Sequence, residues 1–161
     1  MELELALKAR IRVTMAKAVE LSSGLMEEEA GRLSALRDRL LGTLTAQLGE
    51  VVLNGHPAKR LPNNLNVSFL GVEDNALMMS MKDVAVSTGS ACSTADPEPS
   101  HVLKALHLPN ERLHSAIRFG LGRFTTAEEV EYVAARVVES VKRLRERSSA
   151  YRRARQPVGT T

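Results

Sequence analysis

The sequence contains one cysteine, Cys92, which lies in a stretch of small residues between Ser87 and Ala95. A thiol buried only for packing normally has large apolar neighbours, whereas hydroxyl-bearing residues and a glycine surround this one. A lone cysteine is most often an inert small hydrophobe, and reactivity must be weighed against that interpretation. The polar, glycine-containing context favours a mobile thiol that acts as a nucleophile.

A thiol attacks as the thiolate, which a nearby cation or a helix N-terminus stabilises. Asp96 is a candidate N-cap for a helix predicted over Pro97–Leu106, a few residues after Cys92. Three histidines are candidate proton acceptors: His101, His107 and His114. Their spacing puts no two of them on adjacent turns of one helical face, which favours ordinary surface histidines. One cysteine with scattered histidines also does not supply a zinc ligand set, so no metal site is predicted.

Arg118 lies in an alternating segment, Ser115–Leu121, that is typical of a strand buried on one face. The apolar face of this strand comprises Ile117, Phe119 and Leu121. Arg118 falls on the other face, between the small residues Ala116 and Gly120, which leave its guanidinium accessible. Two roles stay open for it: a clamp for a carboxylate or phosphate, or a structural ion pair with an acidic side chain.

Hydrophobic periodicity predicts the elements that position these residues. Leucines three and four apart predict a helix from about Val13 to Gln47, as one helix or two, with Gly24 and Gly31 as candidate bends. The pattern then predicts a short strand over Glu50–Gly55, a strand over Asn64–Phe69, a helix over Asp74–Met81 and a short strand over Ala85–Ser87. Thr126 and Glu129 have the spacing of a capping box, and they open an amphipathic helix that reaches about Arg147.

Composition and element order predict one α+β domain, with a small, mostly antiparallel sheet covered by helices and a long N-terminal helix. Aromatic residues make up only 3% of the 161-residue chain, which argues against nucleic-acid binding by base stacking. The basic residues after Lys142 are interpreted as a solvated helix end and a disordered tail over 148–161. A single cysteine, no signal-like N-terminus and no apolar stretch long enough to span a bilayer predict a cytoplasmic protein without membrane contact.

Five segments carry a family resemblance: Leu53–Pro57, Leu61–Phe69, Ser87–Ser93, Glu98–Leu103 and Ser115–Thr126. In this order they resemble the C-terminal part of the cysteine desulfurases, which are class-V aminotransferases. The likeness extends from about residue 13 to residue 147. It is nearest to the group that supplies sulfur for iron–sulfur cluster assembly.

This resemblance implies that Cys92 takes sulfur from L-cysteine, which leaves L-alanine and a persulfide on the protein. It implies that Arg118 holds the carboxylate of the substrate. It also implies the fold of the small domain of fold-type-I enzymes, pyridoxal phosphate as cofactor, and a sulfur-acceptor or scaffold protein as partner. The tail from Tyr151 to Thr161 does not resemble the C-terminal extension of the family.

In that family a lysine of a large domain, mostly preceding the part seen here, binds pyridoxal phosphate. Several lysines do not occur in the sequence context of that residue, and no cofactor-binding residue is assigned: Lys8, Lys17, Lys59, Lys82 and Lys104. We therefore expect an N-terminal segment over 1–12, a small domain over 13–147 and the basic tail over 148–161. Such a chain is expected to be truncated and inactive alone, and to pair with a large-domain chain or as a homodimer. The alternative is a non-catalytic persulfide carrier or dimerisation module.

Overall fold

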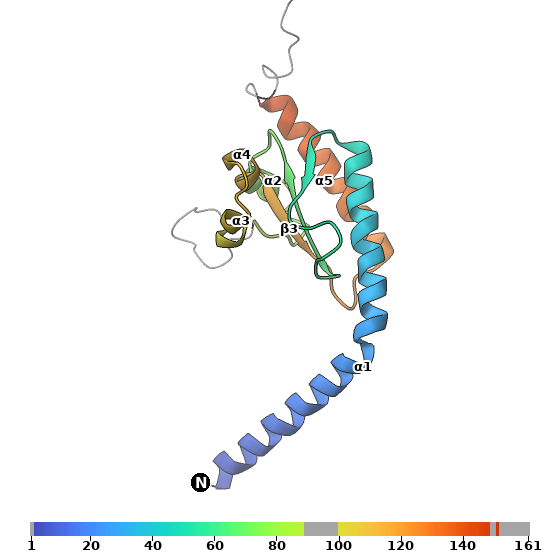
Figure 1. The fold of residues 1–161 in the computed structure, drawn as a ribbon, viewed down its shortest axis with the longest axis vertical. Helices are drawn as coiled ribbons and strands as arrows, with labels where there is room; N and C mark the ends of the chain where they lie inside the picture. The colour runs from blue at the N-terminus through green and yellow to red at the C-terminus, as the bar shows by residue number, and fades with distance from the viewer. Residues whose placement is uncertain (1, 89–99, 149–150, 152–161) are drawn as a thin grey trace, which may run out of the picture.

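The computed structural model describes residues 2–88, 100–148 and 151 (Figure 1). Its elements are α1 (Glu2–Gln47), β1 (Val51–Leu53), β2 (Asn64–Phe69), α2 (Asp74–Ser80), α3 (His101–Ala105), α4 (Asn110–Leu113), β3 (Ala116–Gly120) and α5 (Ala127–Arg147). The three strands form one antiparallel sheet in the order β1-β2-β3. The predicted α+β class, with a small antiparallel sheet and a long N-terminal helix, is confirmed.

Side chains of β2 and β3 alternate between the two faces of the sheet. Leu65 pairs with Phe119 and Val67 pairs with Ile117, and all four side chains are buried. The opposite face carries Asn64, Asn66, Ser68, Ala116, Arg118 and Gly120. This alternation confirms the predicted faces of both strands and separates an apolar face from a largely polar one.

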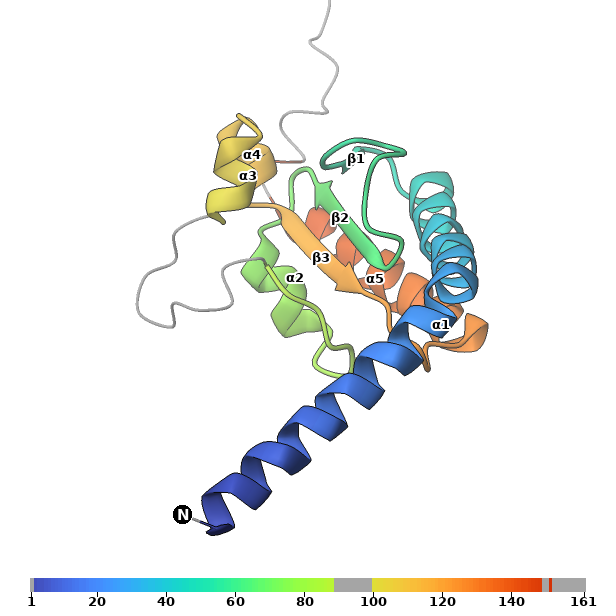
Figure 2. The same ribbon diagram turned by 60° about the horizontal axis from the view of Figure 1, so that its bottom comes forward.

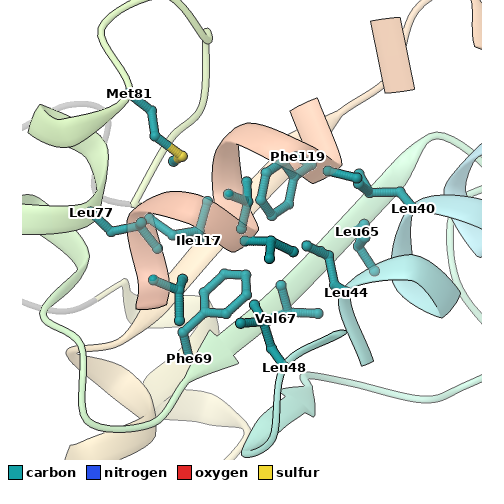
Figure 3. Packing of buried hydrophobic residues seen from close by; sticks show 14 of the residues in the cluster. Leu40, Leu44, Leu48, Leu65, Val67, Phe69, Leu77, Met81, Ile117 and Phe119 are labelled. Carbon is teal, nitrogen blue, oxygen red and sulfur yellow. The ribbon is translucent and has the colours of Figure 1, made fainter. Parts of the chain in front are cut away.

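Helices cover the apolar face. Figure 2 shows α5 behind the sheet, and α1 runs beside α5 in both ribbon views. Figure 3 shows side chains from α1, from α2 and from the residue after each helix near those of β2 and β3: Leu40, Leu44, Leu48, Leu77 and Met81. The amphipathic helix α5 adds Val130, Ala134, Val137, Val138 and Val141 to the same cluster. The core therefore lies between the sheet and these three helices.

Helix α1 is a single helix that begins at Glu2, earlier than the predicted start near Val13. Figure 1 shows a change of direction within α1, and the part on the N-terminal side of it extends away from the sheet. That part exposes large apolar side chains: Ile11, Val13, Met15, Val19, Leu21 and Met26. Among the described helices, none combines the length and the apolar character that crossing a membrane requires.

Capping and a buried arginine fix the two ends of α5. The predicted capping box is present, because Thr126 accepts from the backbone of Glu129 and the Glu129 side chain accepts from the backbone of Thr126. At the other end Arg145 is only 7% exposed and donates to the carbonyls of Gly49, Glu50 and Leu70. Most of the tail predicted to be disordered lies outside the described residues.

The predicted helix over Pro97–Leu106 is wrong at its start. Helix α3 begins at His101, and Ser100 occupies the N-cap position with an extended ψ of 129°, so Asp96 is not the cap. The predicted cap Asp96 and residues 97–99 of the predicted helix lie outside the described residues. The sequence pattern also missed α4, which has only 4 residues. The short strand predicted over Ala85–Ser87 is reduced to a single bridge at Ser87.

Leu44 provides a test of the core. It is 0% exposed, and Leu44→Ala is expected to lower the free energy of unfolding by about 2–5 kcal/mol, the usual cost of such a cavity. Leu61, which is 66% exposed, is the matched control, and Leu61→Ala is expected to change stability by less than about 1 kcal/mol. Urea unfolding followed by circular dichroism measures both. Equal losses in the two variants would contradict this description of the core.

Candidate functional site

Four polar residues lie next to one another across the sheet: Asn54, Asn66, Arg118 and Ser87. Asn66 pairs with Arg118 in the β2–β3 register, and the backbone N–H of Asn54 donates to the Asn66 carbonyl at 2.9 Å. On the other side Ser87 and Arg118 exchange two backbone hydrogen bonds of 3.2 and 2.7 Å. Residues that face each other in an antiparallel pair point to the same side of a sheet. These four residues, here named the polar row, therefore share the face opposite the core.

Arg118 is the charged member of the polar row. Its side chain is exposed, and its Nη2 atom lies 3.5 Å from the Ser87 hydroxyl, which is a long contact. Within residues 2–88 and 100–148, no carboxylate lies at ion-pair distance from this guanidinium. The contacts found here favour a guanidinium available to a ligand over the structural ion pair that the sequence left open.

One end of the polar row is held by a buried hydrogen-bond network. Asn54 is 2% exposed, and its amide donates to Asn66 Oδ1 at 2.7 Å and to the Ser68 hydroxyl at 2.8 Å. Arg112 of α4 donates to Asn54 Oδ1 at 2.6 Å. The Ser68 hydroxyl in turn donates to the carbonyl of Arg112 at 2.7 Å. Such a network restricts the rotamers of its members, so the Asn66 side chain is fixed in orientation.

The other end of the row is the start of the segment that carries Cys92. Upstream of Ser87, the Asp83 carboxylate accepts from Arg136 Nε at 2.9 Å and from the Tyr132 hydroxyl at 2.5 Å. Hydrogen bonds from Arg136 and then from Tyr132 lower the pKa of Asp83, and the same contact with Asp83 raises the pKa of Tyr132. Two residues of α5 thus anchor the segment that leads to Ser87. Cys92 itself lies outside the described residues, as does its predicted mobility.

Among the described residues, none of the three histidines makes a hydrogen bond to Arg118. All three are exposed: His101, His107 and His114. The expected helix N-terminus close to Cys92 is also not where the sequence placed it, because α3 begins only at His101. In the described part of the chain, no three His, Cys, Asp or Glu side chains gather as a metal site.

A largely apolar cavity of about 570 Å³ lies between the segment at Asp83, the end of β3 and the start of α5. Leu40 and Phe119 are among the residues that line it, together with Tyr132. None of the four residues of the polar row lines this cavity.

Asn54, Asn66 and Ser87 were not predicted as site residues from the sequence. A signal for Asn66 was present, because asparagine is depleted in strands and β2 carries Asn64 and Asn66 on its polar face. Periodicity places Asn66 on the face opposite the core, but only the register of β2 against β3 shows that it lies beside Arg118.

Residues 11–133 match the family described as aminotransferase class-V, which is most of the chain. The chain belongs to the class-V aminotransferase family. A cysteine desulfurase IscS of Anaeromyxobacter sp. (strain Fw109-5) is 52% identical over 146 residues, covering 91% of this chain and 36% of that protein. A cysteine desulfurase of Mus musculus is 47% identical and covers 84% of this chain and 30% of its own length.

A solved structure titled NifS-like protein matches this class-V chain with a TM-score of 0.67 and 26% identity, covering 79% of this chain and 32% of that one. A NifS-like protein from Rickettsia africae has a TM-score of 0.62 at 20% identity, which supports the fold alone. The chain spans about a third of the length of the relatives it matches. The predicted resemblance to this family, and to its small-domain fold, is confirmed.

The class-V aminotransferase family implies pyridoxal phosphate, which needs a lysine for its imine. The lysines whose side chains the structure describes are all exposed: Lys17, Lys59, Lys82, Lys104 and Lys142. Lys17 pairs with Glu20 on the surface of α1, and none of the five lines the cavity near Asp83. The described residues of this chain therefore do not fit the cofactor.

The contribution of Asp83 and its hydrogen bonds to stability is expected to depend on pH. Because the pKa of Asp83 is lowered in the folded chain, its stabilisation is present above the ordinary value of 3.8 and is lost as pH falls through the lower folded value. Asp83→Asn is expected to reduce the melting temperature at pH 7 by on the order of one or two degrees. The difference in melting temperature between Asp83→Asn and the parent chain should become smaller below pH 3.8.

Glu139→Gln is the control, because Glu139 pairs with the same Arg136 but lies on α5 and does not touch the segment at Asp83. Thermal unfolding followed by circular dichroism between pH 3 and pH 7 measures both variants. A difference between Asp83→Asn and the parent chain that did not change with pH would contradict the ion-pair explanation.

Proposed function

We propose that this chain is the sulfur-accepting, C-terminal part of a cysteine desulfurase. Cys92 takes the sulfur of L-cysteine, and the products are L-alanine and a Cys92 persulfide. The C–S bond of the substrate breaks, an S–S bond forms, and the thiol proton of Cys92 balances the hydrogen gained at the substrate carbon. No external oxidant or reductant is needed. The persulfide sulfur then passes to an acceptor protein for iron–sulfur clusters or other sulfur-containing cofactors.

The observation that carries this proposal is the bridge between Ser87 and Arg118. Ser87 is bonded through its backbone to Arg118, and Cys92 follows Ser87 by five residues. A fully extended chain gains about 3.3–3.6 Å per residue, so five residues reach about 18 Å at most. The nucleophile is thereby tethered near the guanidinium that would hold its substrate.

Arg118 would bind the carboxylate of L-cysteine. Its planar fork matches a carboxylate in two-point contact. It is exposed, and no described carboxylate competes for it. Its neighbour Gly120, on the same face of β3, is exposed and has no side chain, which leaves room for a ligand at that end, whereas Ala116 is covered by Leu103 and Leu113.

The class-V family implies pyridoxal phosphate as cofactor. We propose that another chain, or a segment outside the described residues, holds it. The apolar side chains on the N-terminal part of α1 support such a partner, because a surface that exposes Ile11, Met15, Val19 and Met26 is typical of an interface. A large-domain chain is our first candidate for the covering surface, and a second copy of this chain is the other.

A second function stays open: a persulfide carrier or dimerisation module without catalysis of its own. The exposed lysines favour it, since the described residues offer no site for the cofactor. Such a carrier would receive sulfur at Cys92 from another protein or a small persulfide. The two functions differ in whether L-cysteine itself is the donor once the large domain is supplied.

Loading of Cys92 is directly measurable. After incubation with a small-molecule persulfide donor and removal of excess reagent, intact-mass spectrometry is expected to show one added sulfur atom on the chain. Cys92→Ser should show none, because no other thiol is present. Ser87→Ala, which keeps the thiol, is the matched control and should load to a similar extent. Added sulfur on Cys92→Ser would contradict the assignment.

The chain alone is expected not to convert L-cysteine. Sulfide release and L-alanine formation should stay at background when pyridoxal phosphate is added, and an absorbance titration should show no saturable lysine imine. Background turnover agrees with both candidate functions. Full desulfurase activity from these 161 residues would contradict the assignment of the cofactor to another part.

A further inference from the structure

We propose that the Asn66 side-chain amide is a second hydrogen-bond donor to the carboxylate that Arg118 binds. This inference rests on the proposed function for the identity of the ligand, the α-carboxylate of an amino acid. Its basis is the polar row, in which Asn66 stands directly opposite Arg118 on the same face of the sheet.

The orientation of the Asn66 amide follows from the donors and acceptors around it. An arginine side chain can only donate, so the atom of Asn54 that meets Arg112 Nη2 at 2.6 Å must be the oxygen. The Asn54 nitrogen then faces Asn66 and Ser68, at 2.7 and 2.8 Å. Because that nitrogen is a donor, Asn66 must present its oxygen to Asn54. Arg112 therefore sets the orientation of two successive amides.

This orientation leaves the Asn66 nitrogen for a ligand. Asn66 is half-buried, and its Nδ2 atom donates to no group in the described part of the chain. Residues directly opposite each other in an antiparallel pair have Cβ atoms about 4.5–5.5 Å apart. The Asn66 and Arg118 side chains thus start from neighbouring positions on the same face of the sheet.

The ligand that fits is a small carboxylate. Its two oxygens offer about four lone-pair positions, which is enough for an arginine fork and one amide donor together. The groups flanking Arg118 across the sheet, Asn66 and the Ser87 hydroxyl, are neutral, so neither adds a negative charge that would repel an anion. A hydrogen bond to a charged acceptor is stronger than one to a neutral acceptor. Asn66 would therefore contribute to affinity and fix the angle of the carboxylate.

Titration of the full 161-residue chain with L-alanine tests the inference. L-alanine carries the carboxylate of the proposed product but cannot transfer sulfur, and L-alaninamide lacks the carboxylate. In ¹⁵N–¹H spectra we expect saturable shifts of the Asn66 side-chain amide and the Arg118 Nε–H with L-alanine. L-alaninamide should cause neither shift.

Two substitutions at Asn66 separate donor loss from loss of fold. Asn66→Asp keeps an oxygen for the hydrogen bond from Asn54 but replaces the donor by a negative charge, and it should abolish the shift of Arg118. Asn66→Ala should weaken L-alanine binding about tenfold, as expected for one hydrogen bond to a charged group. Asn63, an exposed asparagine just before β2, is the matched control, and Asn63→Ala should bind as the parent chain does.

The outcomes distinguish this inference from the function on which it rests. Saturable binding that Arg118→Ala removes but that both Asn66 variants retain would overturn the role of Asn66 and leave the carboxylate clamp in place. Absence of any saturable shift in the parent chain would overturn the clamp and the role of Asn66 together. Persulfide loading of Cys92, measured separately, tests the sulfur-accepting step in either case.

Discussion

Antiparallel pairing between β2 and β3 puts Val67 opposite Ile117 and Asn66 opposite Arg118. A slip of one residue would turn both apolar side chains out of the core and both polar ones into it. Val67 and Ile117 are 0% exposed, so burial strongly favours the observed register. That same register brings Asn66 beside Arg118. The candidate site is therefore assembled by the packing on the other face of the sheet.

Helix α5 holds two segments that flank the β2–β3 pair. In its first half, Tyr132 and Arg136 form hydrogen bonds to Asp83. Asp83 begins the segment that leads to the bridge at Ser87. Near its end, Arg145 donates to carbonyls on either side of the β1–β2 hairpin, at Gly49 and Leu70. Between them, an apolar stripe packs on the sheet. One amphipathic helix thus stabilises the fold and anchors the chain before Cys92.

Local patterns predicted the elements that burial on one face defines. The alternation in β2 gave its observed bounds, and the capping box at Thr126 gave the start of α5. The helix expected from Pro97 is described only from His101, as α3 with Ser100 at its N-cap, and the residues before Ser100 lie outside the described part of the chain. The polar row could not be predicted in the same way. Asn54, Asn66 and Arg118 are far apart in sequence, and only strand register brings them together.

Solvent exposure limits how strongly Arg118 binds a carboxylate in this chain alone. An exposed pair between a guanidinium and a carboxylate contributes only about 0–1 kcal/mol, because water screens the charges and competes for the hydrogen bonds. The same pair is stronger where a second surface excludes water. Arg118 is exposed and does not line the cavity near Asp83. A covering surface would therefore strengthen substrate binding under the proposed function. Under the proposed function, the same covering part supplies the cofactor for which no described lysine is suited, and the polar row is one wall of a site that two parts form.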